Sequence, residues 1–551
     1  MKRGFTLVEL LAILVILAIM ILIALPSLTD MTKKTEENKS QEALNNIYMA
    51  TENYIMANYD NSLDTVGGFT YVNIIRDLIG QNYIDINTLN PNTNLSFSSD
   101  DAVKITRNED WTFSYELTTS KTLIGLLLEQ YDSSNTTGLL EDSTNSNIYY
   151  FKGTNDEVSN NYLWYGGHHW RVVEFDISDN TVLLISQQPL TSIQPAVNAW
   201  DDQESYEKSY VARWLETCFY NSLASSIQNN ILFNTFNVGI GSNVSEITTT
   251  QKVGLLDVEQ YKRAGEQNSY LDIKDDYWLG NRSSSSCIFA VGTVGDGDWE
   301  GFTTVNSYGI RPVIRINDVE ITGGNGTLTS NYKTNYRSTS TSNVQVGEYI
   351  NVPYSSNDGA CGSDNLCTFR VVSKDSDSIK VVLNGLLSST SVYGDTMTIT
   401  TSHTIYTSLN AFADNISTTY RYAGSNKTFY IGDYPSGASY TDVWAEILYA
   451  TVGLPTVGEM FSGNDIDMSL PSSNSKTFVD ANTIENSATS YNYWTMNRNT
   501  SSYVRIVTNY GQMINNGNQS YKWGVRPVIF LKSNLTFTGG NGTAESPYEL
   551  Q

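Results

Sequence analysis

Residues 308–327 read YGIRPVIRINDVEITGGNGT, and residues 523–543 read WGVRPVIFLKSNLTFTGGNGT. The two stretches are so alike, with Arg311 and Arg526 lying 215 positions apart, that they indicate one structural unit present twice in the chain. Each contains a short apolar run, IRPVIRI or VRPVIFL, of the kind that a buried strand needs. The repeat therefore predicts a buried strand near the end of each unit.

Further similarities upstream keep the same order in both halves. DYWLGNRSSS corresponds to NYWTMNRNTS, HHWRVVEFDISDNTVLLIS to CTFRVVSKDSDSIKVVLNG, and LLDVEQY to LPTVGEM. We therefore predict repeats at residues 149–330 and 340–551, joined by a linker at 331–339 that has no apolar pattern. WRVVEF and TVLLIS predict a hairpin across an Asp-Asn turn, and YVARWLETCFYNSLASSIQ predicts a helical segment between the strands.

The chain begins with a long apolar segment that contains a single acidic residue. Residues 5–25, FTLVELLAILVILAIMILIAL, would form a helix of about 31 Å, which is enough to span the hydrocarbon of a membrane. Lys2 and Arg3 precede it, so we expect the amino terminus to stay cytoplasmic and the rest to be exported. Glu9 lies inside this span, where a carboxylate costs roughly 2.5 kcal/mol or more and therefore needs a purpose.

Beyond Pro26 the chain is predicted to continue as a polar amphipathic helix, so that one long helix covers residues 5–60. Its apolar face, formed by residues 43, 47, 50 and 54, should pack against the next domain. Residues 61–148 then predict a small head. FTYVNIIRDLIGQNYIDINTL suggests a helix leading to a turn, and AVKITRNEDWTFSYELTTS suggests two strands around an Asn-Glu-Asp turn.

The stretch KRGFTLVELL closely resembles the class III signal of type IV pilins and of the related pseudopilins. The resemblance implies that a prepilin peptidase removes the leader, residues 1–4, by cutting after Gly4, and that Phe5 is then N-methylated. It also implies that the Glu9 carboxylate pairs with the charged amino terminus of a neighbouring pilin subunit, which makes the carboxylate tolerable in lipid. The alternative is an ordinary membrane anchor that carries a chance glutamate.

The two repeats resemble a bacterial domain family of unassigned function that has a C-type-lectin-like fold. Its members open with a Trp-Arg-Val strand and a hairpin, and they close with a variable loop and a Gly-Ile/Val-Arg-Pro strand. The matching positions are Trp170, Arg171, Trp278, Arg282 and Arg311 in the first repeat, and Phe369, Arg370, Trp494, Arg498 and Arg526 in the second. We expect the arginines of the Arg-Pro pairs and the two later tryptophans to be buried, with direct ligand binding as the alternative.

The predicted fold class is therefore α+β. A long membrane-spanning helix with a small pilin-like α/β head precedes two repeated C-type-lectin-like domains. The fold alone does not predict sugar binding, because the Glu-Pro-Asn and Trp-Asn-Asp signatures of calcium-dependent lectins are absent from the sequence.

The formal net charge of −25 argues against a nucleic-acid partner and against broad contact with anionic lipid. In an exported chain the four cysteines permit two disulfides, Cys361 with Cys367 and Cys218 with Cys287. No Cys-x-x-Cys pair is present, so a thiolate zinc site is not expected.

Candidate metal ligands are few. His168 and His169 are adjacent on a predicted strand and should point to opposite faces, so they cannot readily share one metal. Asp296, Asp298 and Glu300 alternate in a glycine-rich loop and form a weak calcium candidate, because the other repeat has no carboxylates there. No nucleophile–base set, phosphate loop or paired-carboxylate site stands out, so we expect neither an enzyme nor a cofactor.

The sequence predicts a minor type IV pilin-like subunit that assembles through its N-terminal helix and displays two lectin-like domains for adhesion or ligand binding. Its expected partners are other pilin subunits, the prepilin peptidase, the membrane and a surface ligand such as a glycan. The precursor should lie in the inner or cytoplasmic membrane, and the assembled subunit in an extracellular filament. The alternatives are a pseudopilin of a secretion or DNA-uptake system and a membrane-anchored extracellular enzyme.

Overall fold

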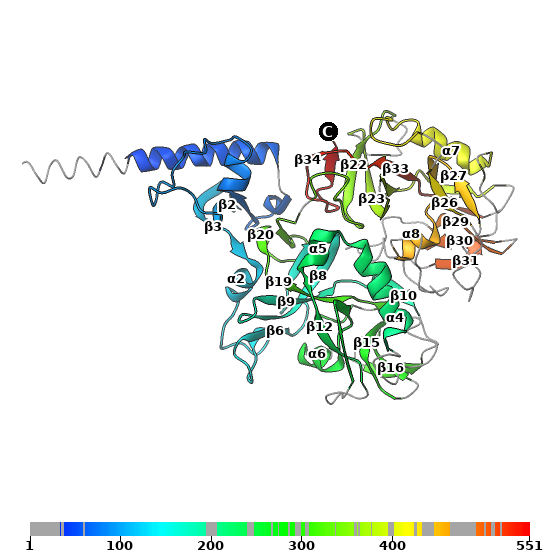
Figure 1. The fold of residues 1–551 in the computed structure, drawn as a ribbon, viewed down its shortest axis with the longest axis horizontal. Helices are drawn as coiled ribbons and strands as arrows, with labels where there is room; N and C mark the ends of the chain where they lie inside the picture. The colour runs from blue at the N-terminus through cyan, green and yellow to red at the C-terminus, as the bar shows by residue number, and fades with distance from the viewer. Residues whose placement is uncertain are drawn as a thin grey trace, which may run out of the picture. The chain divides into compact units, whose positions relative to one another are not determined.

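The computed structural model of the chain describes residues 34, 38–58, 61–193, 206–239, 247–265, 268–273, 275–284, 287–292, 299–303, 308–336, 338–356, 361, 364–375, 377–394, 400, 402–423, 427–431, 446–462, 492–500, 503–508, 513–517 and 521–550. It divides into two compact units, one of Met1–Ala57 and Tyr71–Ser120, the other of Asn58–Thr70 and Lys121–Gln551. Strands predominate over helices in the described residues, as Figure 1 shows.

The first unit contains a helix at residues 38–57, drawn in dark blue in Figure 1. Ile47, Ala50 and Tyr54 are buried on one side of it, which confirms the predicted apolar face. A hairpin of β2 (Asp101–Arg107) and β3 (Phe113–Thr119) also belongs to this unit. It confirms the two strands predicted around the Asn-Glu-Asp turn, and the rings of Tyr48 and Tyr115 stack at 5.7 Å between the helix and β3.

The prediction of a helix from residue 69 onward is wrong at its start. The structure places β1 at Phe69–Asn73 and a single π-helical segment, η2, at Ile74–Ile79. The residues FTYVN are aromatic or β-branched for most of their length, and such side chains favour a strand over a helix. Asn73 then starts the helical segment by accepting a hydrogen bond from the Arg76 N–H at 2.8 Å.

The first predicted repeat, called the first repeat below, has a main sheet with the strand order β11-β19-β9-β8-β7-β21-β20, with β21 parallel to β7 and the other pairs antiparallel. Its strands are β7 (Tyr162–Tyr165), β8 (His168–Asp176), β9 (Thr181–Ser186), β11 (Ile231–Leu232), β19 (Val313–Asn317), β20 (Glu320–Gly323) and β21 (Tyr332–Thr334). The hairpin of β8 and β9 confirms the one predicted across the Asp-Asn turn, where Asn180 has a φ of 56°.

A second sheet of this repeat has the order β10-β18-β15-β16-β17. Its strands are β10 (Thr191–Ile193), β15 (Tyr277–Arg282), β16 (Cys287–Val291), β17 (Trp299–Thr303) and β18 (Tyr308–Ile310). A separate hairpin is formed by β12 (Asn234–Asn237) and β13 (Thr248–Gln251), and β14 (Val253–Gly254) pairs with β19. The predicted helical stretch at residues 210–228 is helical but broken, into α4 (Tyr210–Arg213), η3 (Trp214–Tyr220) and α5 (Ser225–Asn230), and α6 (Val258–Arg263) follows.

Strands β4 (Lys121–Thr122), β5 (Gly138–Glu141) and β6 (Ile148–Lys152) extend this main sheet. Two short helices, η1 (Asn61–Asp64) and α2 (Leu123–Leu128), also lie ahead of residue 149 in the same compact unit. Strand β6 pairs with β8, and β4 pairs with β20. The continuous part of the second compact unit therefore begins at Lys121, ahead of the boundary predicted at residue 149.

The second half of the chain has the same strand orders. Its main sheet runs β28-β33-β24-β23-β22-β35-β34, with β35 parallel to β22, and its second sheet runs β25-β32-β29-β30-β31. The main-sheet strands are β22 (Tyr349–Pro353), β23 (Leu366–Lys374), β24 (Ser378–Leu383), β28 (Val452–Gly453), β33 (Val528–Lys532), β34 (Phe537–Gly539) and β35 (Tyr548–Leu550).

The remaining elements of this half also have counterparts in the first. They are β25 (Ser388–Val392), α7 (Thr404–Ala413), β26 (Thr428–Tyr430), β27 (Ile447–Tyr449), α8 (Val457–Ser462), β29 (Tyr493–Thr500), β30 (Tyr503–Val507), β31 (Met513–Gly517) and β32 (Lys522–Val525). Strands β26 and β27 form a hairpin, as β12 and β13 do. Parallel pairing joins Tyr493 to Gly524 and, in the first repeat, Tyr277 to Gly309.

The apolar runs IRPVIRI and VRPVIFL are not single strands, in contrast to the prediction. In each repeat the Arg-Pro pair separates a strand of the second sheet from a strand of the main sheet, β18 from β19 and β32 from β33. Proline lacks the N–H that a ladder needs, so a strand ends readily at Pro312 and at Pro527. The chain passes from one sheet to the other at this point in both repeats.

The shared GGNGT segments have the same backbone conformation. Gly324 and Gly326 have φ values of 84° and 77°, and Gly540 and Gly542 have 80° and 77°. A Cβ atom on Gly324 would lie 1.8 Å from the carbonyl oxygen of Asn331, so this turn requires glycine.

The predicted membrane span at residues 5–25 lies outside the described residues. Among those that are described, no helix has the length and apolar character needed to cross a membrane.

Candidate functional site

A groove of about 430 Å³ lies in the described part of the first repeat. The helical segment η3 contributes Glu216 and Tyr220 to its lining. The hairpin β12–β13 and its ends contribute Phe233, Gln251 and Lys252. The volume falls in the range of about 300–1,000 Å³ that small-molecule sites occupy.

Local structure explains why these residues meet. Glu216 and Tyr220 lie four positions apart on one helical segment and therefore face the same side. Gln251 pairs with Asn234 at the end of the β12–β13 hairpin. This pairing brings the residues just beyond that end, Phe233 and Lys252, next to each other.

Lys252 is held between two aromatic rings. Its ammonium nitrogen lies 5.5 Å from the centroid of the Tyr220 ring and 5.5 Å from that of Phe233, within the range of a cation–π contact. The same nitrogen donates a hydrogen bond to the Gln228 carbonyl oxygen at 3.1 Å. Phe233 is nevertheless 69% exposed, so much of its ring remains open to solvent.

Carboxylates complete the lining. Glu207 accepts a hydrogen bond from the Thr249 hydroxyl at 3.2 Å, and both Glu207 and Glu216 are exposed. The groove thus combines hydrogen-bond acceptors, an ammonium donor, the Gln251 amide and an open aromatic ring. Such groups can donate hydrogen bonds to a small polar ligand, accept them from it and stack against it.

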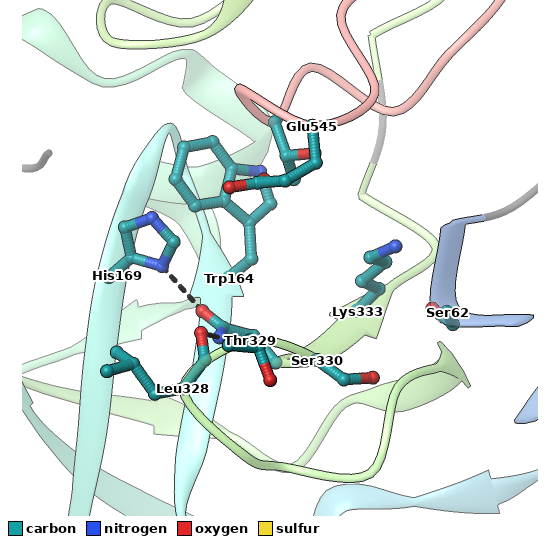
Figure 2. A pocket seen from close by; sticks show the side chains of 10 residues that line it. Ser62, Trp164, His169, Leu328, Thr329, Ser330, Lys333 and Glu545 are labelled. Carbon is teal, nitrogen blue, oxygen red and sulfur yellow. Dashed lines mark hydrogen bonds between the residues drawn. The ribbon is translucent and has the colours of Figure 1, made fainter. Parts of the chain in front are cut away.

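Figure 2 shows a second, much smaller pocket, in which Trp164 and His169 lie opposite Lys333. Its volume of about 20 Å³ holds about one water molecule. His169 Nδ1 lies 2.5 Å from the Asn331 amide oxygen, and the imidazole packs edge-on against Trp164 with 4.6 Å between the ring centroids. Burial lowers the pKa of His169 to about 4, so the ring is neutral at pH 7.

His168 is also neutral, because burial holds its pKa well below the usual value. The two imidazoles have different surroundings. His168 packs beside Phe219, with 5.5 Å between ring centroids, whereas His169 bonds to Asn331. Among the described residues, no group of three His, Cys, Asp or Glu side chains is placed to hold a metal ion.

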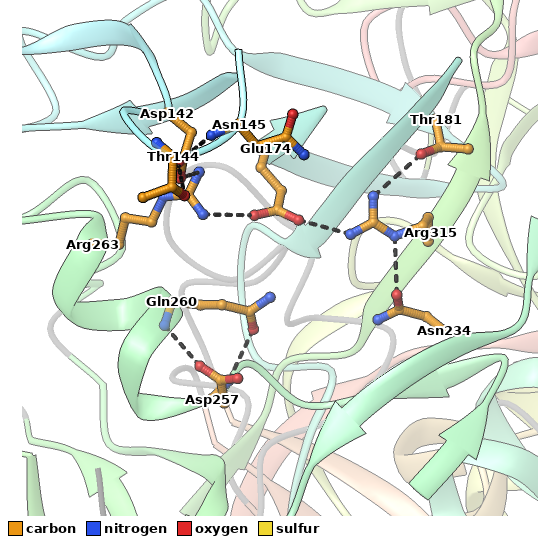
Figure 3. A network of polar contacts seen from close by, with 10 residues as sticks. All are labelled: Asp142, Thr144, Asn145, Glu174, Thr181, Asn234, Asp257, Gln260, Arg263 and Arg315. Atoms are coloured by element: carbon orange, nitrogen blue, oxygen red, sulfur yellow. Dashed lines mark hydrogen bonds and ion pairs between the residues drawn. The ribbon is translucent and has the colours of Figure 1, made fainter. Parts of the chain in front are cut away.

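Figure 3 shows a polar network that joins α6 to the main sheet of the first repeat. Glu174 on β8 lies between two arginines, 3.4 Å from Arg263 and 2.7 Å from Arg315. Arg263 also pairs with Asp142 at 3.2 Å, and Arg315 donates to Asn234 at 3.0 Å. Every charge is partnered, so the network is structural, and through Asn234 it anchors β12 beside the groove.

The repeat landmarks lie in the core and not in the groove. Trp170, Arg171, Trp278, Arg282, Arg311, Phe369, Arg370, Trp494 and Arg526 are all buried. Arg498 is half-buried and its guanidinium lies 2.7 Å from the Glu446 carboxylate. Their burial favours the structural interpretation over direct ligand binding.

The arginines of the two opening strands differ in their partners. Arg171 donates to the Asn161 amide oxygen at 2.6 Å, to the Tyr162 hydroxyl at 2.8 Å and to the Val158 carbonyl at 2.5 Å. Burial lowers its pKa to about 10, which leaves it charged at neutral pH. Arg370 donates through Nε to the Gly347 carbonyl at 3.0 Å and packs over the Tyr349 ring at 5.1 Å.

One of the two permitted disulfides is formed. Cys361 and Cys367 are bonded, with 4.8 Å between their Cα atoms. The predicted pairing of Cys218 with Cys287 is wrong, because no disulfide joins them. Cys218 is buried within η3, whereas Cys287 is half-buried at the start of β16, and a pattern of cysteine spacings cannot reveal such separate environments.

The predicted processing and assembly residues, Gly4, Phe5 and Glu9, lie outside the described residues. So do Asp296 and Asp298 of the calcium candidate. Glu300 falls within β17, of which only the backbone is described. These three acidic residues therefore stay an untested prediction.

Sequence reasoning missed the groove because its residues do not recur in the second repeat. Val253 and Val452 occupy the same place, opposite Ile314 and Ile529 of the equivalent strands. From this alignment Gln251 and Lys252 correspond to Ala450 and Thr451. A search for shared motifs overlooks such residues. The signal available was the Glu216-x-x-x-Tyr220 spacing on a predicted helix.

Comparison with known proteins gives information on the amino terminus. Residues 1–25 match the family model described as the prokaryotic N-terminal methylation motif. No curated protein and no solved structure matches the chain. The motif is the one that prepilin peptidases process, so the chain carries a type IV pilin-like signal at its amino terminus.

Proposed function

We propose that this protein is a minor type IV pilin-like subunit that displays two C-type-lectin-like domains at the cell surface for adhesion or ligand binding. The observation that carries the proposal is the match of residues 1–25 to the methylation motif. The role is structural and binding, and we assign no catalytic residue. The partners are other pilin subunits, the prepilin peptidase and the membrane.

Glu9 gives the motif a physical purpose. The cut after Gly4 creates a new amino terminus at Phe5, and its ammonium group can neutralise the Glu9 carboxylate of a neighbouring subunit. A carboxylate that is costly in lipid then favours assembly, because only packed helices provide the partner. The precursor would lie in the cytoplasmic membrane, and the assembled subunit would lie in a filament outside the cell.

The matching strand orders of the two halves support a tandem pair of one domain. The Arg-Pro passage between sheets, the GGNGT turns and the parallel pairing of the closing strands recur in both. The Cys361–Cys367 disulfide supports an oxidising exterior. A pair of domains of this size would crowd a repeated shaft, which favours a minor subunit over a major one.

The proposal can be tested by measuring the mass of the amino-terminal peptide of the protein purified from its native cells. We expect a chain that begins at an N-methylated Phe5. A chain that begins at Met1, or that is cut near Ala24, would refute the proposal. Glu9→Gln should be processed normally but lost from sheared filaments, whereas Glu42→Gln on the exposed side of the helix should assemble like the wild type.

The same preparation distinguishes the pseudopilin alternative, which shares the motif. A processed subunit that stays with the cell envelope when filaments are sheared away would favour a secretion or uptake system. Recovery with the filaments at low abundance would favour a minor pilin.

A further inference from the structure

We propose that the groove of the first repeat, lined by Glu207, Glu216, Tyr220, Phe233, Gln251 and Lys252, binds a neutral saccharide. This inference rests on the proposed function only in requiring an exposed, exported domain. It adds the site and the chemical class of its ligand.

The exposed Phe233 ring offers an apolar surface to a ligand. A large aromatic side chain that is 69% exposed on the wall of a 430 Å³ recess has no role in the core of the described fold. Lys252 lies 5.5 Å from its centroid and fixes the ring without covering it fully. An apolar face placed in this way suits the C–H face of a pyranose ring.

The polar groups of the groove match the hydroxyl groups of a sugar, because each sugar hydroxyl both donates and accepts hydrogen bonds. The Glu207 and Glu216 carboxylates are acceptors, and the Gln251 amide can act as either. An ammonium carries three donors, and in the described chain Gln228 is the single hydrogen-bond partner of Lys252. A ligand hydroxyl can therefore be bonded from two sides.

The charges in the groove favour an uncharged ligand. Two carboxylates line the groove against one ammonium, and the chain carries a net charge of −25, so an acidic ligand would be repelled. A cationic side chain would compete with Lys252, which already occupies the cation position between the Tyr220 and Phe233 rings. An uncharged ligand rich in hydroxyl groups avoids both conflicts.

The second repeat provides a matched control within the same chain. In its equivalent hairpin Ala450 and Thr451 stand at the positions of Gln251 and Lys252, so the amide and the ammonium are missing from those two positions. The ammonium of Lys427, just before β26, is instead paired with Asp377 at 2.6 Å. Tyr449 lies on this hairpin and is 57% exposed, so it resembles Phe233 in exposure but not in surroundings. We expect binding at the first repeat alone.

The test uses the full-length protein in detergent on an array of neutral oligosaccharides, each printed beside its sialylated or sulfated counterpart. We expect at least one neutral glycan to bind and its acidic counterpart to bind more weakly. Phe233→Ala and Gln251→Ala should each weaken binding by about tenfold or more, and Tyr449→Ala should leave it unchanged. Because these side chains are exposed or half-buried, unchanged thermal unfolding should show that the variants are folded.

Absence of binding to every neutral glycan would overturn the inference. So would a preference for the acidic counterparts, or binding that Phe233→Ala does not alter. The outcome is independent of the pilin proposal. A methylated Phe5 without glycan binding would refute only the saccharide site, and glycan binding by a chain that begins at Met1 would refute only the filament role.

Discussion

Lys380 and Glu459 form an ion pair in the interior of the second repeat, with 2.6 Å between Nζ and Oε1 and side-chain exposures of 4% and 0%. The ammonium also lies 5.0 Å from the Phe429 ring and 5.2 Å from the Phe530 ring. Glu459 has a second role, because its other oxygen accepts a hydrogen bond from the Thr456 N–H at the start of α8. One carboxylate thus joins the capping of a helix to a buried cation of the main sheet.

We expect Lys380→Met to lower the free energy of unfolding by about 3–5 kcal/mol, because it leaves the buried Glu459 carboxylate without its partner. Lys380→Met combined with Glu459→Gln should recover most of the loss, since the amide keeps an acceptor for Thr456 and carries no charge. Urea unfolding followed by tryptophan fluorescence would measure both. The control is Glu129→Gln, which breaks the exposed Lys121–Glu129 pair and should change stability little. A single variant as stable as the wild type would contradict the buried pair.

The arginines of the two Arg-Pro pairs should be equally intolerant of lysine. Arg311 donates from Nε to the Ser186 carbonyl at 2.9 Å, and Arg526 donates in the same way to the Leu383 carbonyl at 2.7 Å. From Nη1, Arg311 also donates to the Leu271 carbonyl at 2.8 Å, and Arg526 to the Tyr493 hydroxyl at 3.3 Å. Lysine lacks the planar fork and cannot keep both bonds, so Arg311→Lys and Arg526→Lys should each cost about 1.5–3 kcal/mol. Arg213→Lys, on an exposed position of α4, is the matched control. Calorimetry that showed a loss in one repeat and none in the other would argue against equivalent roles.

The sequence predicted local structure correctly where a pattern of residues is compatible with only one kind of structure. The spacing of Ile47, Ala50 and Tyr54 predicted the buried face of a helix. Asp179-Asn180 predicted the tight turn of a hairpin, because apart from glycine few residues adopt a positive φ as easily as Asn. The repeated Arg-Pro motif predicted two related segments, although not that each would divide between two sheets. A proline within an apolar run was the available sign of that division.

The other features could not be predicted from the sequence, because they depend on contacts between residues that are far apart in the chain. Glu216 lies on η3, whereas Phe233 and Lys252 flank the β12–β13 hairpin, and the three share no motif, so only folding brings them into one groove. The Cys218 and Cys287 spacing looked compatible with a disulfide, but the thiols belong to different secondary structures and do not bond. A Lys380–Glu459 pair across 79 positions is likewise invisible in a sequence without homologues.

The cysteines should differ in their reactivity in the native protein. Cys361 and Cys367 are expected to resist alkylation until a reductant is added, because they form a disulfide. Among the other two, half-buried Cys287 should react faster than Cys218, which is buried. Peptide mapping of the full-length protein, alkylated with and without reductant, would measure all four. Alkylation of Cys361 without reductant would show that the bond does not form in the cell.

Glu348 should make the second repeat less stable as the pH rises. Its carboxyl is buried and accepts hydrogen bonds from the Gln345 N–H at 2.7 Å, the Ser338 hydroxyl at 2.9 Å and the Tyr548 hydroxyl at 3.0 Å. Burial outweighs these bonds and the attraction of Lys374, and it raises the pKa of Glu348 to about 7 from an ordinary value of 4.5.

Between those two pH values the folded chain holds a proton that the unfolded chain has released, so its stability falls as the pH rises from about 4.5 to about 7 and is level above that. In Glu348→Gln this contribution is absent. Relative to the variant, the wild type should lose about 3 kcal/mol over this interval, which corresponds to the shift in pKa. Urea unfolding of both proteins at pH 4.5, 6 and 8 would measure the difference. If the wild type kept the same stability relative to the variant at all three pH values, or became more stable than the variant as the pH rose, the pKa of Glu348 would not be raised in the folded protein.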